Sequence, residues 1–189
     1  ARLLGRDGLT RVADFSTLNA NYLQAKLNKF DMAFPNRRAS HEFILTLPKE
    51  SFDRISEGGT PKATSIAKIG KLFLDFGLHA PTMAFPEIYG MMIEPTESYT
   101  KAELDRFSEI VSSILILINE TPEILTTAPH FTPVGKVNEV DANKNLNLAG
   151  TISSLPKLPE GFINPKEMDT VSISEICQKI LRKHKEITQ

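Results

Sequence analysis

The connection from Gly77 to Thr82 places a histidine where a helix is expected to give way to a strand. The sequence Gly-Leu-His-Ala-Pro-Thr puts the imidazole of His79 two residues before a proline, and Thr82 adds a hydroxyl. An imidazole can donate, accept or carry charge near neutral pH, so His79 could bind a ligand or move a proton. It could equally be a structural hydrogen-bonding residue of the loop, and both interpretations stay open.

A second polar segment follows an apolar run and precedes a helix. Glu94-Pro95-Thr96-Glu97 offers two carboxylates and a hydroxyl at a strand end, where site residues are often found. The same groups could instead cap the next helix. Upstream, Arg37-Arg38 could grip a carboxylate or phosphate through paired hydrogen bonds, or simply face solvent.

Other kinds of site find little support in the sequence. The four histidines are scattered and Cys177 is the single cysteine, so a metal site is not predicted. Gly58-Gly59 lacks the lysine of a phosphate-binding loop, and no Gly-x-Ser-x-Gly elbow is present.

Hydrophobic periodicity predicts the elements that must position these residues. Thr60 is expected to cap a helix that Gly77 ends, and Thr100 with Glu103 has the spacing of a capping box. Residues 49–60 are expected to form a polar connection, and residues 126–170, rich in proline, an irregular one. We expect helices over 7–29, 61–76, 100–121 and 172–186, and strands over 42–47, 82–86 and 89–94. This order predicts an α+β fold with helices packed on a small, mostly antiparallel sheet.

Composition narrows the class of protein. The 189 residues carry 22 Lys plus Arg and 23 Asp plus Glu, a net charge of −1, which argues against a nucleic acid or an anionic membrane as main partner. A single cysteine excludes an internal disulfide and fits a reducing compartment. No apolar run approaches the roughly 20 residues that span a bilayer. Because the chain starts without Met, we expect it to be cut, processed or incomplete.

Several segments in their order and spacing resemble the carboxyl-terminal part of the glycine decarboxylase P-protein, or its second subunit where the family is split into two chains. The resemblance runs from about Gly5 to about Val140, and the tail after about Leu148 has no counterpart in it. The segments that carry it are Leu18-Asn19-Ala20-Asn21-Tyr22-Leu23, Arg38-Ala39-Ser40-His41-Glu42-Phe43, Leu74 to Thr82, Ile93 to Ser98, Lys101 to Phe107 and Ala128-Pro129-His130.

The resemblance implies an enzyme that uses pyridoxal 5'-phosphate as electron sink to release carbon dioxide from glycine, and then passes the aminomethyl group to the lipoyl arm of H-protein. The lysine that would hold the cofactor has no recognisable place here, since His184-Lys185 lacks the glycines that follow it in the family. We therefore expect a part of the enzyme that is inactive alone. Its partners would be the remaining part of the P-protein or the first subunit, in a dimer or heterotetramer, in the cytoplasm or, for a eukaryote, the mitochondrion.

The family's fold is that of the aspartate-aminotransferase-like group, so the resemblance implies a small carboxyl-terminal domain. Residues 1–29 would be a connecting helix, residues 30–125 the small domain, and residues 126–189 a wrap-around segment with a terminal helix. Catalytic residues are not expected in this chain. Its expected substrate-binding residues are His79, Thr82, Glu94, Thr96, Arg38 and His41.

Two other functions remain open. The chain could be a binding or regulatory module that kept the small domain without its chemistry. It could also be an independent small enzyme that uses His79 and Glu94 as an acid–base pair.

Overall fold

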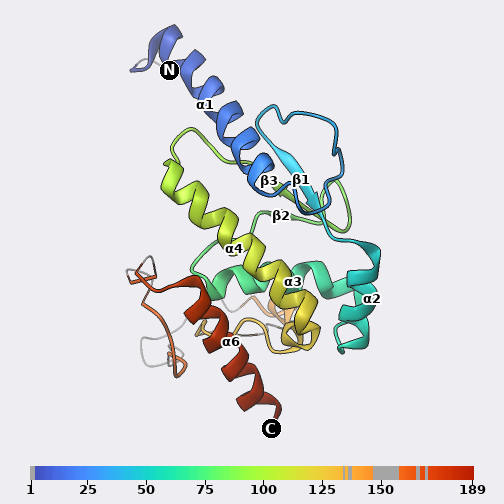
Figure 1. Cartoon of the computed structure of the whole chain (residues 1–189). Coiled ribbons are helices and arrows are strands. Elements are labelled where there is room, and N and C mark those ends of the chain that lie inside the picture. Colours follow the sequence, from blue (N-terminus) through green and yellow to red (C-terminus); the bar gives the residue numbers. More distant parts are fainter. Residues whose placement is uncertain (1–2, 134, 136–137, 147–157, 165–166, 169) are drawn as a thin grey trace.

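A computed structural model describes residues 3–189 except for 134, 136–137, 147–157, 165–166 and 169 (Figure 1). The elements are α1 (Gly5–Lys26), β1 (Phe43–Thr46), α2 (Lys49–Glu57), α3 (Lys62–Asp75), β2 (Thr82–Met83), β3 (Gly90–Ile93), α4 (Lys101–Glu120), the 3-10 helix η1 (Pro122–Thr126), α5 (Glu139–Lys144) and α6 (Ile173–Thr188).

The three strands form one antiparallel sheet in the order β1-β3-β2. Phe43 pairs with Ile93 at one end of β1 and β3, and Thr82 pairs with Met92 on the other side of β3. Leu45 and Met91 are fully buried, because helices cover this small sheet. The predicted α+β architecture with a small antiparallel sheet is confirmed, although β2 is shorter than the expected strand over 82–86.

Helix α3 ends as its sequence predicts. Gly77 has a φ of +73°, a backbone conformation that side chains with a Cβ rarely adopt. Its N–H donates to the carbonyl of Leu74, and the N–H of Leu78 donates to that of Phe73, which is the Schellman pattern of helix termination. The turn therefore sends the chain out of α3 directly into the segment that carries His79.

Helix α4 also starts as predicted. The hydroxyl of Thr100 accepts from the N–H of Glu103, and the carboxylate of Glu103 accepts from the N–H of Thr100 at 2.7 Å. This capping box fixes the first turn of α4, which follows the Glu94–Glu97 segment. Helix α4 crosses the middle of the molecule and contacts α1, α2, α3, η1 and α6 (Figure 1).

Two predictions about residues 49–60 are wrong. The expected polar connection contains α2, whose side chains Phe52 and Ile55 are fully buried. Thr60 does not cap α3, because Pro61 occupies the N-cap position without a side-chain hydrogen bond. The hydroxyl of Thr60 is buried and has no hydrogen-bond partner among the described residues.

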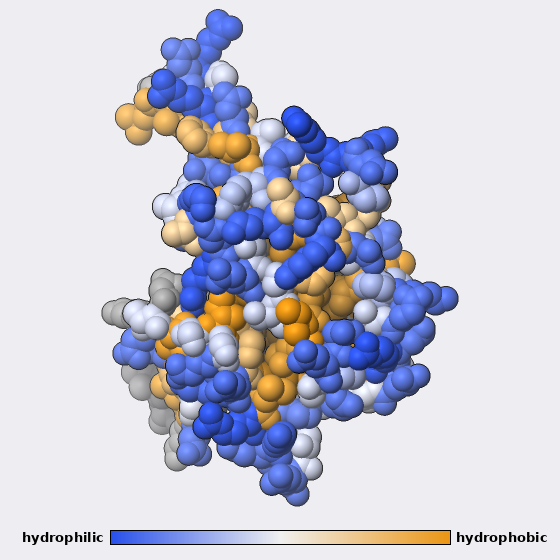
Figure 2. All heavy atoms as spheres, viewed as in Figure 1, coloured by the Kyte–Doolittle hydropathy of each residue, from blue (hydrophilic) through white to orange (hydrophobic). Residues whose placement is uncertain are grey.

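Helix α1 projects at its amino-terminal end beyond the rest of the molecule (Figure 1). Its carboxyl-terminal half is packed: the amide of Asn19 donates to the carbonyl of Thr96, and the amide of Asn21 donates to that of Ala39. The projecting half is not, and the apolar side chain of Leu9 is 48% exposed there. Figure 2 shows apolar side chains on the surface at this end of the molecule.

Helix α6 completes the hydrophobic core from the far end of the chain. Ser172 caps it by accepting from the N–H of Glu175, and Ile176 and Ile180 are fully buried. The expected irregular stretch 126–170 contains the short helix α5, and part of that stretch lies outside the described residues. Among the described helices none is long and apolar enough to span a membrane.

Candidate functional site

A cleft of about 600 Å³ opens where α3 ends and β3 meets the start of α4. The segment after Gly77 brings His79 and Thr82 to its wall, and the segment after β3 brings Glu94. All three side chains are exposed. The structure therefore brings together three of the six expected substrate-binding residues. We call this space the α3–β3 cleft.

Two charged groups of the α3–β3 cleft are held by structural contacts. Glu103 belongs to the capping box of α4, and its hydrogen bond from the Thr100 backbone lowers the pKa of its carboxyl group. The guanidinium of Arg106 donates to the carbonyl oxygens of Met168 and Val171. Within the described residues, the side chains of His79 and Glu94 have no hydrogen-bond or ion-pair partner. These two groups are thus available to a ligand.

The other three expected residues lie outside the α3–β3 cleft. Thr96 is exposed, and its hydroxyl lies 2.7 Å from that of Ser98. Arg38 and His41 line a second cleft of about 380 Å³ formed by residues 32–44 and Gln24. The six residues that the sequence suggests as one set therefore do not share one site. Three of them line the α3–β3 cleft, Arg38 and His41 line the second cleft, and Thr96 lines neither.

The loop that carries Arg38 is held by the amide of Gln24 on α1. That amide donates to the carbonyl of Arg37 at 2.9 Å, and its oxygen accepts from the N–H of Ala39. Nε2 of His41 lies 3.6 Å from the carboxylate of Glu42. The role of Arg38 and His41 in substrate binding stays a prediction.

A buried chain of polar side chains begins at Asp75, directly before the cleft-lining residues Phe76 and Gly77. Asp75, the last residue of α3, accepts from the backbone N–H groups of His130 and Phe131 at 2.7 and 2.9 Å. Its second oxygen lies 2.8 Å from Nδ1 of His130, and both side chains are fully buried. Nε2 of His130 lies 2.9 Å from the hydroxyl of Thr127, which lies 2.8 Å from Nδ1 of His184 on α6.

The directions of these hydrogen bonds follow from the carboxylate. An ionised Asp75 can only accept, so Nδ1–H of His130 donates to it and, in a neutral ring, Nε2 is left as an acceptor. The single proton of the Thr127 hydroxyl then lies between two acceptors, Nε2 of His130 at 2.9 Å and the carbonyl of Ile124 at 3.1 Å, and the hydroxyl oxygen can accept from Nδ1–H of His184. One continuous chain, Asp75–His130–Thr127–His184, joins α3, the segment after η1 and α6. The described residues contain no cluster of His, Cys, Asp and Glu that could hold a metal ion.

The family described as "Glycine dehydrogenase, C-terminal domain" matches residues 12–130 of this chain. The chain belongs to this family. That confirms the resemblance derived from the sequence motifs.

Named relatives agree with the family match. "Probable glycine dehydrogenase (decarboxylating) subunit 2" of Coxiella burnetii is 46% identical over 151 residues, which is 78% of this chain and 29% of the relative. Proteins of the same name are 44% identical in Nitrosomonas eutropha and 43% identical in Thiobacillus denitrificans, each with 30% of its length covered. The chain thus spans under a third of the glycine dehydrogenase subunits it matches.

The sequence motifs do not predict most of the buried polar chain of this glycine dehydrogenase family member. His130 belongs to one of the segments that carry the resemblance, and His184 precedes Lys185 in the tail. A signal was present at Asp75, because a carboxylate next to Leu74 and Phe76 on an apolar helix needs a buried partner. His184 lies beyond the family segment, so its contact with Thr127 was not foreseeable from the motifs.

The contact of α6 with the family segment is expected to weaken in acid. Burial lowers the pKa of His184 below its ordinary value of 6.5, and nearby His130 adds to the effect while Glu123 opposes it. The folded state therefore favours neutral His184. Its contribution to stability is complete above about pH 6.5 and is lost as pH falls through the folded-state pKa. Hydrogen-exchange protection of the α6 amides, measured at about pH 7.5 and 5, should drop at the lower pH.

A His184→Gln variant is the control for this pH effect. Glutamine can still hydrogen-bond to Thr127 but does not titrate, so protection of α6 should change less with pH. An equal drop in the variant and the original chain would assign the effect to other groups, such as Glu123.

Proposed function

We propose that this chain is the carboxyl-terminal part of a glycine dehydrogenase (decarboxylating), the P-protein of the glycine cleavage system. In that enzyme it would take part in releasing carbon dioxide from glycine and passing the aminomethyl group to the lipoyl arm of H-protein. The observation that carries the proposal is the family match over residues 12–130. The α3–β3 cleft supports it, because His79, Thr82 and Glu94 come from family segments and face one space.

The described residues that line the α3–β3 cleft do not fit a complete site for pyridoxal 5'-phosphate. The described lining of the α3–β3 cleft contains no lysine that could bind the cofactor covalently. Its carboxylates Glu94 and Glu103 would repel the phosphate group. We place the cofactor's lysine and phosphate contacts in the part of the enzyme that this chain does not include, with the cleft facing the substrate.

The aspartate-aminotransferase-like arrangement is part of the same proposal. Residues 1–29 would be the connecting helix, residues 30–125 the small domain, and residues 126–189 a wrap-around segment with the terminal helix. The exposed apolar side chains of Leu9, Phe15 and Leu18 on α1 support this, since a projecting helix with such side chains needs a covering partner. That partner would be the rest of the P-protein or subunit 1, in a dimer or heterotetramer in a bacterial cytoplasm.

Titration of the chain with pyridoxal phosphate tests where the cofactor binds. After borohydride reduction, mass spectrometry should find no stoichiometric adduct on the chain alone. One adduct on a single lysine would place the cofactor site here and overturn the proposal as stated. Adding the part of the Coxiella burnetii relative that this chain does not cover, with subunit 1 and lipoylated H-protein, should restore exchange of labelled carbon dioxide with glycine. A stable complex without exchange would contradict the proposed activity.

In the completed enzyme, His79→Ala should lower glycine exchange by about 100-fold or more, as loss of a group that contacts substrate or moves a proton does. Because His79 is exposed, the free energy of unfolding should change by no more than about 0.5 kcal/mol. Exchange kinetics and urea unfolding measure the two effects. The comparison variant Glu160→Ala alters an exposed residue outside both clefts and should leave exchange and stability unchanged. Parallel losses of exchange and stability in His79→Ala would show that His79 is structural.

A further inference from the structure

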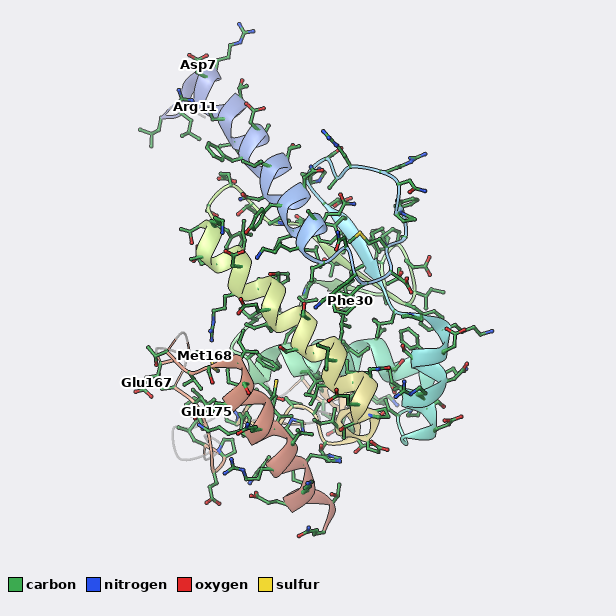
Figure 3. The ribbon with its side chains drawn as sticks, viewed as in Figure 1. Asp7, Arg11, Phe30, Glu167, Met168 and Glu175 are labelled. Carbon is green, nitrogen blue, oxygen red and sulfur yellow. The ribbon has the colours of Figure 1, made fainter. Side chains whose placement is uncertain are left out.

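Asn19 is a buried polar residue in the packed half of α1. Asp7 and Arg11, which Figure 3 labels, mark the projecting end of this helix, and Asn19 lies beyond them with 8% of its surface exposed. Asparagine is a poor residue for a helix interior, because its amide competes with the backbone for hydrogen bonds. A buried polar side chain also needs a partner. The place of Asn19 in α1 is therefore explained by the contact that its amide makes.

That contact reaches the segment that follows β3. Nδ2 of Asn19 donates to the carbonyl of Thr96 at 2.8 Å, although 77 positions of sequence separate the two residues. Residues 94–99 lie between β3 and α4 and form neither helix nor strand. Within the described part of the chain, no other element donates a hydrogen bond to the backbone of residues 94–99. Asn19 thus fixes the middle of this segment.

The contact restrains Glu94 because two anchored residues lie close on either side of it. Ile93 is held by its pairing in the sheet, and Thr96 is held by Asn19. Between these anchors lie Glu94 and the buried Pro95. The proline ring fixes its own φ angle and restricts the residue before it to extended conformations. The main chain of Glu94 therefore has little freedom, and its side chain is kept at the wall of the α3–β3 cleft.

Helix α1 is itself fixed at this point by α4. Tyr22 and Lys26 follow Asn19 at helical spacing, so the three residues lie on one face of α1. The hydroxyl of Tyr22 donates to Oδ1 of Asp105 on α4 at 2.5 Å, and Nζ of Lys26 lies 2.8 Å from the same oxygen. Because these contacts join α1 to α4, the amide of Asn19 has a constant position from which to hold the carbonyl of Thr96.

We propose that Asn19 is a positioning residue of the enzyme. Through the carbonyl of Thr96 it holds Glu94 in the α3–β3 cleft, where Glu94 faces the same space as His79. The inference rests on the proposed function, in which Glu94 contacts the substrate. Asn19 does not line the cleft, so it acts through Glu94 and not by contact with a ligand. Misplacing a group that binds substrate by about 1 Å can lower a rate on the order of 100-fold.

A double-mutant cycle in the completed enzyme, assembled as above, tests this inference with glycine exchange. Asn19→Ala should lower kcat/KM by about 10- to 100-fold. In a Glu94→Gln background the same change should alter kcat/KM by no more than about twofold, because the group that Asn19 holds is already lost. Asn28→Ala removes an amide from an exposed position after the end of α1 and should leave kcat/KM unchanged.

Two results of the cycle would overturn the inference. One is an Asn19→Ala enzyme with unchanged kcat/KM, and the other is a double variant in which the two losses multiply. In both cases glycine exchange by the original enzyme leaves the proposed function standing.

Asn19→Asp separates the hydrogen bond from the packing of the side chain. The ionised carboxylate has the shape of the amide but cannot donate to the carbonyl of Thr96. The loss of kcat/KM should therefore be at least as large as in Asn19→Ala. An active Asn19→Asp enzyme would show that packing alone is required, which contradicts the inference.

NMR relaxation of the 189-residue chain alone gives a measurement that does not depend on activity. The backbone amides of residues 96–99 should be rigid in the original chain, with order parameters of about 0.85, and mobile in Asn19→Ala and Asn19→Asp, with values below about 0.6. The order parameters of α4 should not change, which shows that the variants are folded, and if one variant does not fold the other one decides. Unchanged values for residues 96–99 would overturn the inference. If the original completed enzyme lacks glycine exchange, the proposed function fails, and the order parameters still decide whether Asn19 holds the segment.

Discussion

Asp75→Ala is expected to destabilise the folded chain by about 3–5 kcal/mol. Asp75 accepts three hydrogen bonds in a site without solvent, two from backbone N–H groups and one from the ring of His130. Alanine would leave all three donors buried and unpaired, and each such group is costly. The chain Asp75–His130–Thr127–His184 would lose its charged end. Urea unfolding followed by circular dichroism measures the change.

Asp75→Asn is the matched control for that experiment. The amide keeps the shape and one oxygen, which can still accept from the N–H groups of His130 and Phe131. Its NH₂ group would face Nδ1 of His130, and the imidazole can answer by moving its proton to Nε2 and donating to Thr127. A loss on the order of 1 kcal/mol is expected. Equal losses in the two variants would show that the charge, and not the hydrogen bonds, is what the site requires.

Phe73→Ala is expected to cost about 3–5 kcal/mol of unfolding free energy, the range for removing a fully buried aromatic side chain. Phe73 has no exposed surface, and its ring lies 6.4 Å from that of Phe107 on α4. Its carbonyl also accepts from the N–H of Leu78 in the turn that ends α3, so Phe73 lies where the α3–α4 packing supports the α3–β3 cleft. Thermal and urea unfolding of the purified variant measure the loss.

Phe85→Ala provides the comparison, because Phe85 is 61% exposed in the turn between β2 and β3. Its replacement should change stability by no more than about 0.5 kcal/mol. If Phe73→Ala cost no more than Phe85→Ala, the assigned packing of α3 against α4 would be wrong.

The sequence determined the elements whose signals are local. Thr100 and Glu103 are three residues apart and form their capping box within one turn, so spacing alone predicted the start of α4. Gly77 ends α3 because its backbone conformation is intrinsic to glycine. The family could be identified from the sequence for the same reason, because the resemblance rests on residue types and their spacing along the chain.

Elements with weak local signals were missed or misjudged. Helix α2 has nine residues, of which only Phe52 and Ile55 are buried, so its sequence resembles a polar loop. Its contacts with α3 and α4 stabilise it as a helix. Leu9 continues the apolar pattern of α1, yet nothing in the described chain covers that part of the helix. Periodicity states which face could be buried, but only a neighbouring element buries it.

Only the tertiary structure decided which side chains share a site. His79 and Glu94 meet at one cleft because α3 and β3 end side by side, whereas Arg38 belongs to another surface. Met168 and His184 reach the family segment from far along the chain, through contacts that have no sequence spacing to predict them. Local chemistry fixes turns and caps within a few residues, while clefts and buried polar chains depend on how distant elements pack.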